Sequence, residues 1–208
     1  MLKIESQDLA DLFWYWKSLS HQGAPPLRRE IDPGKIPPTI LPYVYTMIVE
    51  RDPLRFCSSL SGTGVRQLVS RERKGDYVSE ENMGPNFQDA FDSYAKTVET
   101  GRACWGKARF VKALPGDIDL PVEGMFLPLS EAGHTVDYVF GVSALQIPPE
   151  YRMMIEPGIF MTRRWHMDIP PTIIDEAALL PPRQSYVPVI TPAPVSDSVQ
   201  QHQDTAPY

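Results

Sequence analysis

The side chains that could act as nucleophiles, general bases or metal ligands are few and widely separated along this chain. Histidine is a frequent general base and metal ligand. Only one histidine falls inside the domain expected below, and it lies in a hairpin loop. The sequence therefore favours exposed polar residues over a catalytic triad or a metal site. The four histidines are His21, His134, His166 and His202.

The sequence motifs of acyl-transfer and nucleotide-dependent enzymes do not occur here. There is no Gly-x-Ser-x-Gly elbow and no P-loop. Gly62-Thr63-Gly64 is too short to cradle a dinucleotide phosphate and fits a turn from a strand into a helix. Asp117 and Asp119 could form a carboxylate pair for acid–base catalysis, although the solubility of a loop explains them equally well. We expect a protein that is not an enzyme.

Cysteine usage and charge exclude two further classes of site. Cys57 and Cys104 lack Cys-x-x-Cys spacing and a nearby histidine pair, so a zinc site is not expected. A disulfide between them is not expected in a cytosolic chain. The net charge of −6 argues against nucleic acid, whose phosphates require a basic surface. No apolar run is long enough to cross a membrane, and the first residues do not resemble a signal peptide, so we expect a cytoplasmic location.

The first helix is expected over residues 6–19, with Ser6 as N-cap. Its apolar residues recur at spacings of three and four, while Trp14 and Tyr15 lie outside that stripe. Aromatic side chains on more than one side predict that the helix touches both its own domain and a partner. The alternative is that one ring packs over the edge of the stripe. The candidate interface residues are Leu9, Phe13, Trp14, Tyr15 and Trp16.

Residue patterns predict a five-stranded antiparallel sheet with helices between the second and third strands. Lys107 marks the solvent side of the third strand, so Cys104 should face the core. Asp137 marks the outside of the fifth strand, so Tyr138 and Phe140 should face inward. The fourth strand is apolar on both sides, which predicts cover on both faces. The expected strands are residues 43–51, 55–61, 103–112, 121–129 and 136–146.

The fold class is therefore α+β, with a helical middle on one face of the sheet and the N-terminal helix on the other. The predicted parts are a helix with a proline-rich packed loop, a core, a short extension holding one helix, and a disordered proline-rich tail. Pro181-Pro182 in the tail is either a polyproline docking segment or part of a plain solubilising stretch. These parts span residues 1–42, 43–147, 148–168 and 169–208.

This order of elements resembles a PAS domain, and the residue pattern resembles a bacterial family of short, stand-alone PAS proteins. The resemblance covers residues 9–146 and depends on the order and spacing of short motifs. These are Tyr15-Trp16, Pro26 with Arg28, Ile31-Asp32-Pro33, Ile36-Pro37, Leu41-Pro42, Arg55-Phe56, Leu60-Ser61-Gly62-Thr63, Lys74-Gly75-Asp76-Tyr77, Phe126-Leu127-Pro128-Leu129 and Gly141.

The resemblance implies a module that binds small ligands or partners between the sheet and the helical middle, and that dimerises through its first helix. Such short members carry no kinase or cyclase and act on signalling proteins in trans, an argument at the level of the fold. A flavin adduct is disfavoured because neither cysteine follows an asparagine. Histidine-ligated haem is disfavoured because no histidine lies between residues 22 and 133, although Met83 and Tyr94 stay open as haem ligands. No cofactor is expected.

Two functions are favoured, and an enzyme of unknown class is the least expected third. One is a regulatory module that forms a homodimer and contacts a signalling protein. The other is a receptor for a small apolar ligand in a cavity between sheet and helices, for which a filled core is the alternative. The candidate lining residues are Phe56, Ser58, Leu60, Phe87, Phe91, Tyr94, Cys104, Ala108, Phe126, Tyr138 and Phe140.

Overall fold

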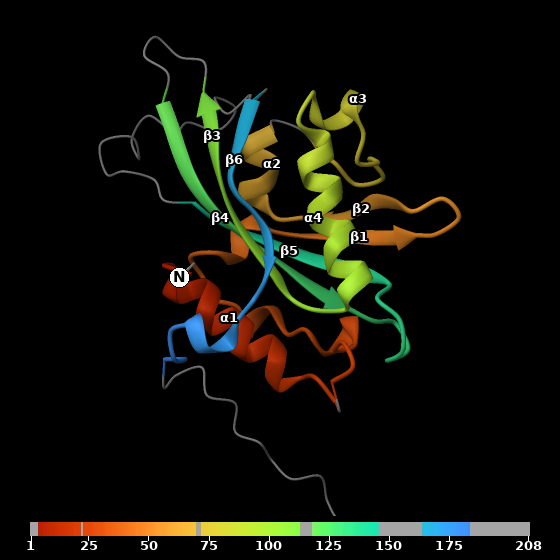
Figure 1. Ribbon diagram of the computed structural model, residues 1–208, viewed down its shortest axis with the longest axis vertical. Helices are drawn as coiled ribbons and strands as arrows, with labels where there is room; N and C mark the ends of the chain where they lie inside the picture. The colour runs from red at the N-terminus through yellow and green to blue at the C-terminus, as the bar shows by residue number, and fades with distance from the viewer. Residues whose placement is uncertain (1–3, 22, 70–71, 113–117, 146–163, 184–208) are drawn as a thin grey trace, which may run out of the picture.

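The chain folds around one antiparallel sheet of six strands, in the order β2-β1-β5-β4-β3-β6 (Figure 1). A computed structural model describes residues 4–21, 23–69, 72–112, 118–145 and 164–183. The strands are β1 (Val44–Glu50), β2 (Arg55–Ser61), β3 (Cys104–Lys112), β4 (Ile118–Leu129), β5 (Tyr138–Leu145) and β6 (Arg164–Ile173). The α-helices are α1 (Gln7–Ser18), α2 (Thr63–Val69), α3 (Glu80–Met83) and α4 (Phe87–Thr100). The 3-10 turns are η1 (Arg28–Glu30), η2 (Pro33–Lys35), η3 (Leu41–Tyr43) and η5 (Glu176–Ala178).

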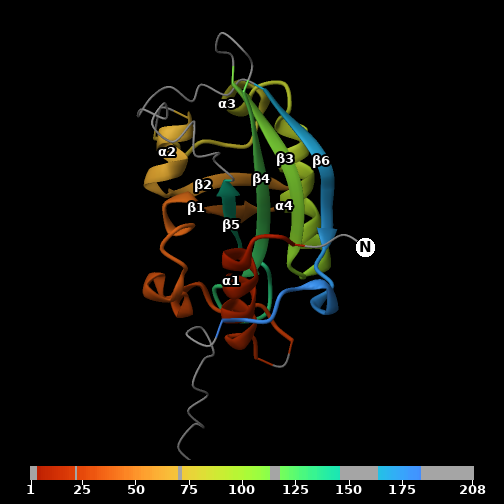
Figure 2. The ribbon, with the colours of Figure 1, turned by 90° about the vertical axis from the view of Figure 1, so that its left-hand side faces the viewer.

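Helices α1 and α4 lie on opposite sides of the sheet (Figure 2). Side chains alternate between the two faces of a strand. Accordingly, Trp105 and Leu127 pack toward α1, while Cys104 and Phe126 pack toward α4. Both faces of β4 are thus buried, as its sequence predicts. The α+β class and the placement of the helical middle and the first helix are confirmed.

Helix α1 forms where its sequence predicts. The Ser6 hydroxyl accepts the backbone N–H of Leu9 at 3.3 Å, which caps the first turn. Leu9, Leu12 and Trp16 then fall on one side and are buried against the sheet. The loop that follows is packed on the same core through Ile36 and Ile40.

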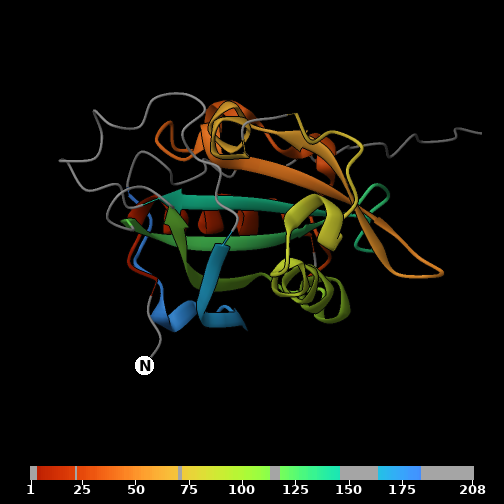
Figure 3. The same ribbon diagram turned by 90° about the horizontal axis from the view of Figure 1, so that it is seen from above.

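The sixth strand is a correction to the sequence prediction. Residues 164–173 pair with β3 at the sheet edge away from β2, where a helix and the start of a disordered tail were expected (Figure 3). Pro170 and Pro171 misled the prediction. They fall in a register shift, between the pairs Lys107–Ile169 and Trp105–Thr172, on an edge strand that tolerates proline.

The β6 bulge has a partner feature in β3. A side chain at Gly106 would place its Cβ only 2.8 Å from the carbonyl oxygen of Ile169. Glycine at this position therefore lets the two backbones approach. Lys96 of α4 donates to the carbonyl of Pro171 at 2.8 Å and fixes the bulge from the other side.

Residues 174–183 continue from β6 across the outer side of α1, and we call them the strap. The tail was predicted to be disordered from residue 169, which is wrong for the part up to residue 183. Ile174 is buried in the α1-side core and donates its N–H to the carbonyl of Ala103 at 3.0 Å. The remainder of the predicted tail, and residues 146–163, lie outside the described residues, so the division into domains stays a prediction.

Candidate functional site

A buried carboxylate fixes the beginning of α1 on the sheet. Glu123 of β4 is 1% exposed, and its two oxygens accept the backbone N–H groups of Glu5 at 3.1 Å and Ser6 at 2.9 Å. The ammonium of Lys107 lies 3.2 Å from the same carboxylate. An ionised acceptor at a helix start is stabilised by the orphan N–H groups there. The start of α1 is therefore anchored directly on the sheet.

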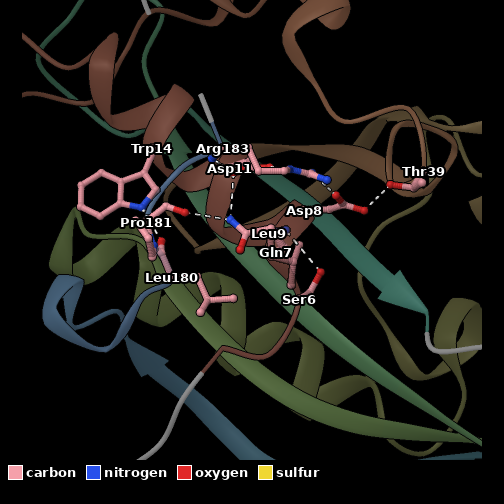
Figure 4. A network of polar contacts seen from close by, with 10 residues as sticks. All are labelled: Ser6, Gln7, Asp8, Leu9, Asp11, Trp14, Thr39, Leu180, Pro181 and Arg183. Atoms are coloured by element: carbon pink, nitrogen blue, oxygen red, sulfur yellow. Dashed lines mark hydrogen bonds and ion pairs between the residues drawn. The ribbon is translucent and has the colours of Figure 1, made fainter. Parts of the chain in front are cut away.

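The outer side of α1 carries three side chains at helical spacing, Gln7, Asp11 and Trp14. With Asp8 beside them they form what we call the outer stripe. The strap runs along this stripe (Figure 4). The indole Nε1 of Trp14 donates to the carbonyl oxygen of Leu180 at 2.9 Å, and Gln7 Nε2 donates to the carbonyl oxygen of Pro181 at 2.9 Å. Side chains of the helix thus bind the backbone of the strap.

The charged end of the strap is Arg183. Its backbone N–H donates to Asp11 Oδ1 at 2.9 Å, and its guanidinium pairs with both Asp11 and Asp8 (Figure 4). The second oxygen of Asp8 accepts the hydroxyl of Thr39. Hydrogen bonding to Asp11 raises the pKa of Arg183. Asp11 is fully buried, and the guanidinium and Gln7 satisfy its charge.

The other end of the strap is held by a second ion pair. Lys17, in the last turn of α1, pairs with Glu176 of η5. The same ammonium lies 5.6 Å from the centre of the Trp14 ring, a cation–π distance. Trp14 is therefore approached by the strap carbonyl at its edge and by Lys17 at its face.

The predicted interface residues take a different role from the one expected. Leu9, Phe13, Tyr15 and Trp16 are buried in the chain's own core, and only Trp14 is partly exposed. In this fold the four buried side chains are not open to a partner.

The aromatic residues of α1 anchor neighbouring segments instead. Trp16 Nε1 donates to the carbonyl of Pro128 at 3.0 Å. The Tyr15 hydroxyl bridges the carbonyl of Glu30 and the N–H of Asp32, and burial raises its pKa. The rings on the second side of the helix thus hold the proline-rich loop.

Sequence reasoning missed four residues of this site: Gln7, Asp8, Asp11 and Arg183. A signal for the first three was present, because residues 7, 11 and 14 share one side of a helix opposite the apolar stripe. Arg183 had no local signal, because its partners lie more than 170 residues away in sequence.

The candidate ligand pocket is partly assembled on the α4 side of the sheet. The ring of Phe56 lies 5.2 Å from Phe91 and 5.3 Å from Tyr94, and Tyr94 lies 5.7 Å from Phe126, all in edge-to-face contact. Cys104 joins this cluster. The rings therefore fill the centre of the predicted pocket with one another.

Tyr138 and Phe140 were predicted to line the same pocket, and the structure places both on the α1 side. Strand β5 is covered on both faces, so side chains on either face point into a core. Val139, which lies between Tyr138 and Phe140, is the residue that packs toward α4. Asp137 marks only the end of the strand, where its N–H bonds the carbonyl of Leu129 at 2.9 Å.

Leu60 also lies on the other face from Phe56 and Ser58. Ser58 pairs with Met47 and Leu60 pairs with the next residue, Thr46, so Ser59 is an extra residue in β2. A one-residue bulge moves the following side chains to the opposite face. Leu60 is accordingly 43% exposed.

The last two predicted pocket residues lie on or near this face but outside its cluster. Ala108 is buried on β3, four residues beyond Cys104 and on the same face, and pairs with Val122. Phe87 is half-buried in the first turn of α4. Neither belongs to the apolar cluster around Tyr94.

Polar groups lie inside this aromatic cluster. The rings of Tyr45 and Tyr94 are 6.2 Å apart, and burial raises the pKa of both phenols. Ser58 is buried, and its hydroxyl has no hydrogen-bond partner among the described residues. The positive charge of Arg73, whose side chain is 12% exposed, acts on both phenols. This set could hydrogen-bond a polar or anionic atom of a ligand.

The described ranges hold neither a metal-binding cluster nor a membrane-spanning helix. Across those ranges no three histidine, cysteine or acidic side chains gather closely enough to hold a metal ion. None of the helices described combines the length and apolar character needed to cross a bilayer. His21 is exposed, and its Nε2 lies 3.4 Å from Oε1 of Glu30.

An antiparallel sheet with a helical middle on one face and a capping helix on the other defines an α+β domain of the PAS-like kind. The family model of the PAS domain matches residues 4–144, about two thirds of the chain, and the chain belongs to this family. No curated protein and no solved structure matches it. Strand β6 and the strap follow the matched residues and are additions to the PAS core.

Proposed function

We propose that this PAS chain is a regulatory module, without catalytic activity of its own, that acts in trans on a signalling protein by direct contact. The outer stripe of α1 is the partner surface. The observation that carries this proposal is the contact that the stripe already makes: Trp14 binds a backbone carbonyl while Asp11 binds an arginine. Backbone recognition by an indole together with charge recognition by carboxylates is suited to peptide binding.

The position of α1 supports the same proposal. Glu123 fixes the start of the helix to the sheet. A partner bound to the outer side of the helix is therefore connected to the PAS core through this contact. A change inside the core, around Tyr94 and Phe126, would reach that surface through β4, which contributes to both cores. Homodimerisation and a cytoplasmic location belong to this proposal.

Site-specific photo-crosslinking in the native cell tests it. A crosslinking amino acid replaces Trp14 in one protein and the exposed Glu99 of α4 in a matched control. We expect position 14 to capture a signalling protein or a second copy of this chain, and position 99 to capture neither. Equal capture at both positions, or none at position 14, contradicts the proposed surface. Deleting α1 is unsuitable, because Leu9, Leu12 and Trp16 are core residues.

The alternative function is a small-molecule receptor. It is favoured by the buried hydroxyl of Ser58, whose hydrogen-bonding capacity is unused among the described residues. Such groups in proteins are usually satisfied by water or a ligand. Native mass spectrometry of the purified chain, with Ser58→Ala as comparison, tests this function. A retained mass that the variant loses supports a receptor, and a chain that carries no added mass and shows no thermal shift with a metabolite panel contradicts it.

A further inference from the structure

The last four residues of the strap, Leu180–Arg183, occupy the surface that a partner would need. We propose that they are a ligand bound in cis, and that the outer stripe of α1 recognises in trans a peptide of the same chemistry, leucine-proline-proline-arginine. This inference rests on the proposed function, since it names the partner's chemistry and the way the site is kept occupied.

The first argument is that the stripe recognises backbone groups. Trp14 donates to the carbonyl of Leu180, Gln7 donates to the carbonyl of Pro181, and Asp11 accepts the N–H of Arg183. Residues 180–183 belong to no helix or strand, so these backbone groups are not used in secondary structure. Consecutive prolines keep such a segment extended and its carbonyls unpaired. The same contacts are open to any peptide with this backbone.

The second argument is that the carboxylates select arginine. One guanidinium pairs with both Asp8 and Asp11, which are three residues apart on the helix. A planar fork with several donors can contact two carboxylates at once, whereas an ammonium group is a single point charge. Thr39 donates its hydroxyl to the other oxygen of Asp8, a contact that does not involve the strap. Lysine at the fourth peptide position should therefore bind more weakly.

The third argument is that this part of the strap can leave without disturbing the fold. Pro181 and Arg183 are exposed, and the Arg183 side chain is 47% exposed. The Arg183–Asp8 pair is partly exposed and contributes only about 0–1 kcal/mol. Asp11 is buried, so its pair with Arg183 contributes more than a surface ion pair does. The anchors of the strap, Ile174 and strand β6, precede these residues and remain in place. Release and rebinding of residues 180–183 is thus a local step.

Peptide binding to the full chain tests the inference. The probe is a fluorescent peptide with the sequence of residues 178–185, Ala-Leu-Leu-Pro-Pro-Arg-Gln-Ser. Arg183→Glu releases the cis segment by placing a third carboxylate beside Asp8 and Asp11. The matched control is Arg102→Glu, the same charge change at an exposed position between α4 and β3. Anisotropy should show the peptide binding at least tenfold more tightly to Arg183→Glu than to the unmodified chain and to Arg102→Glu.

Further changes in the chain and in the peptide test the individual contacts. Adding Asp11→Asn to Arg183→Glu should abolish binding, and a peptide with lysine in place of arginine should bind at least threefold more weakly. The indole N–H resonance of Trp14, assigned with Trp14→Phe, should shift on release and return when peptide is added; Arg183→Gln repeats the test if Arg183→Glu does not fold. Equal affinity for the unmodified chain and Arg183→Glu overturns cis occupancy. Absence of binding to a folded, released variant overturns the peptide chemistry, and crosslinking at position 14 would still support the proposed function.

Discussion

Glu123 accepts the backbone N–H of Ser6 at 2.9 Å, across 117 residues of sequence. This contact joins the start of α1 to the middle of the sheet. The carboxylate is fully enclosed, and Lys107 supplies the opposite charge. Partial burial lowers the pKa of Lys107, but the hydrogen bonds that its ammonium donates to Glu5 and Glu123 outweigh burial and raise this pKa above its ordinary value. One buried side chain therefore organises the helix that carries the proposed partner surface.

Glu123→Gln should lower the free energy of unfolding by about 2–4 kcal/mol. The amide cannot accept two N–H groups with its two terminal atoms, and Lys107 loses its buried counter-charge. Urea denaturation followed by tryptophan fluorescence measures the change. Glu5→Gln is the matched control, because Glu5 pairs with the same lysine but its side chain is 62% exposed. That control should stay within about 1 kcal/mol of the unmodified chain, and an equal loss in both variants would contradict the role of Glu123.

Gly141→Ala should destabilise the chain by about 1–3 kcal/mol, because it overpacks the α4-side core. The added Cβ would lie 2.1 Å from the Tyr45 ring, which covers the glycine. Gly124→Ala on the neighbouring strand is the matched control, since its Cβ would be 3.3 Å from the Phe126 ring. Thermal unfolding measures both. The prediction fails if the two variants melt together.

The elements of the PAS core could be predicted because their signals are local. The apolar stripe of α1, the alternation of β3 and the two-sided apolar character of β4 each depend on neighbouring residues. Helix α4 and the strand pairs follow the expected bounds within a few residues. The order of these elements is what permitted the resemblance to a PAS domain.

The features that sequence reasoning missed depend on distant contacts. Strand β6 contains two prolines that are compatible with a strand only because β3 offers Gly106 opposite the bulge. Leu60 changes faces because of one extra residue, Ser59, and a single sequence cannot show which strand holds a bulge. The site on α1 includes Arg183, which lies in the proline-rich segment that the sequence predicted to be disordered. These are tertiary effects, outside the reach of local periodicity.

The Tyr45–Tyr94 pair should make the fold sensitive to alkaline pH. Burial raises the pKa of both phenols above the ordinary value of about 10. A group whose pKa is raised in the folded state adds stability that is complete below its unfolded pKa and is lost as the pH rises through the folded value. The free energy of unfolding should therefore decrease above about pH 10.

Denaturation at several alkaline pH values, with absorbance at 295 nm to follow phenolate, measures this effect. Tyr45→Phe is the comparison that removes the phenol with the larger rise in pKa. Its stability should decline less steeply over the same pH interval. Identical slopes in the two proteins would show that this pair does not control the alkaline limit.

The two thiols should differ in reactivity while the chain is folded. Cys104 is fully buried beside α4, and Cys57 is half-buried on the outer face of β2. Burial raises the pKa of both thiols, so less reactive thiolate is present near pH 8 than in the unfolded chain. A disulfide reagent should modify Cys57 first and Cys104 only at the rate of opening, and both rates should rise with pH. Cys57→Ser should remove the faster phase and leave the slower one unchanged. A faster phase that survives in this variant would place the accessible thiol at Cys104 and contradict its burial.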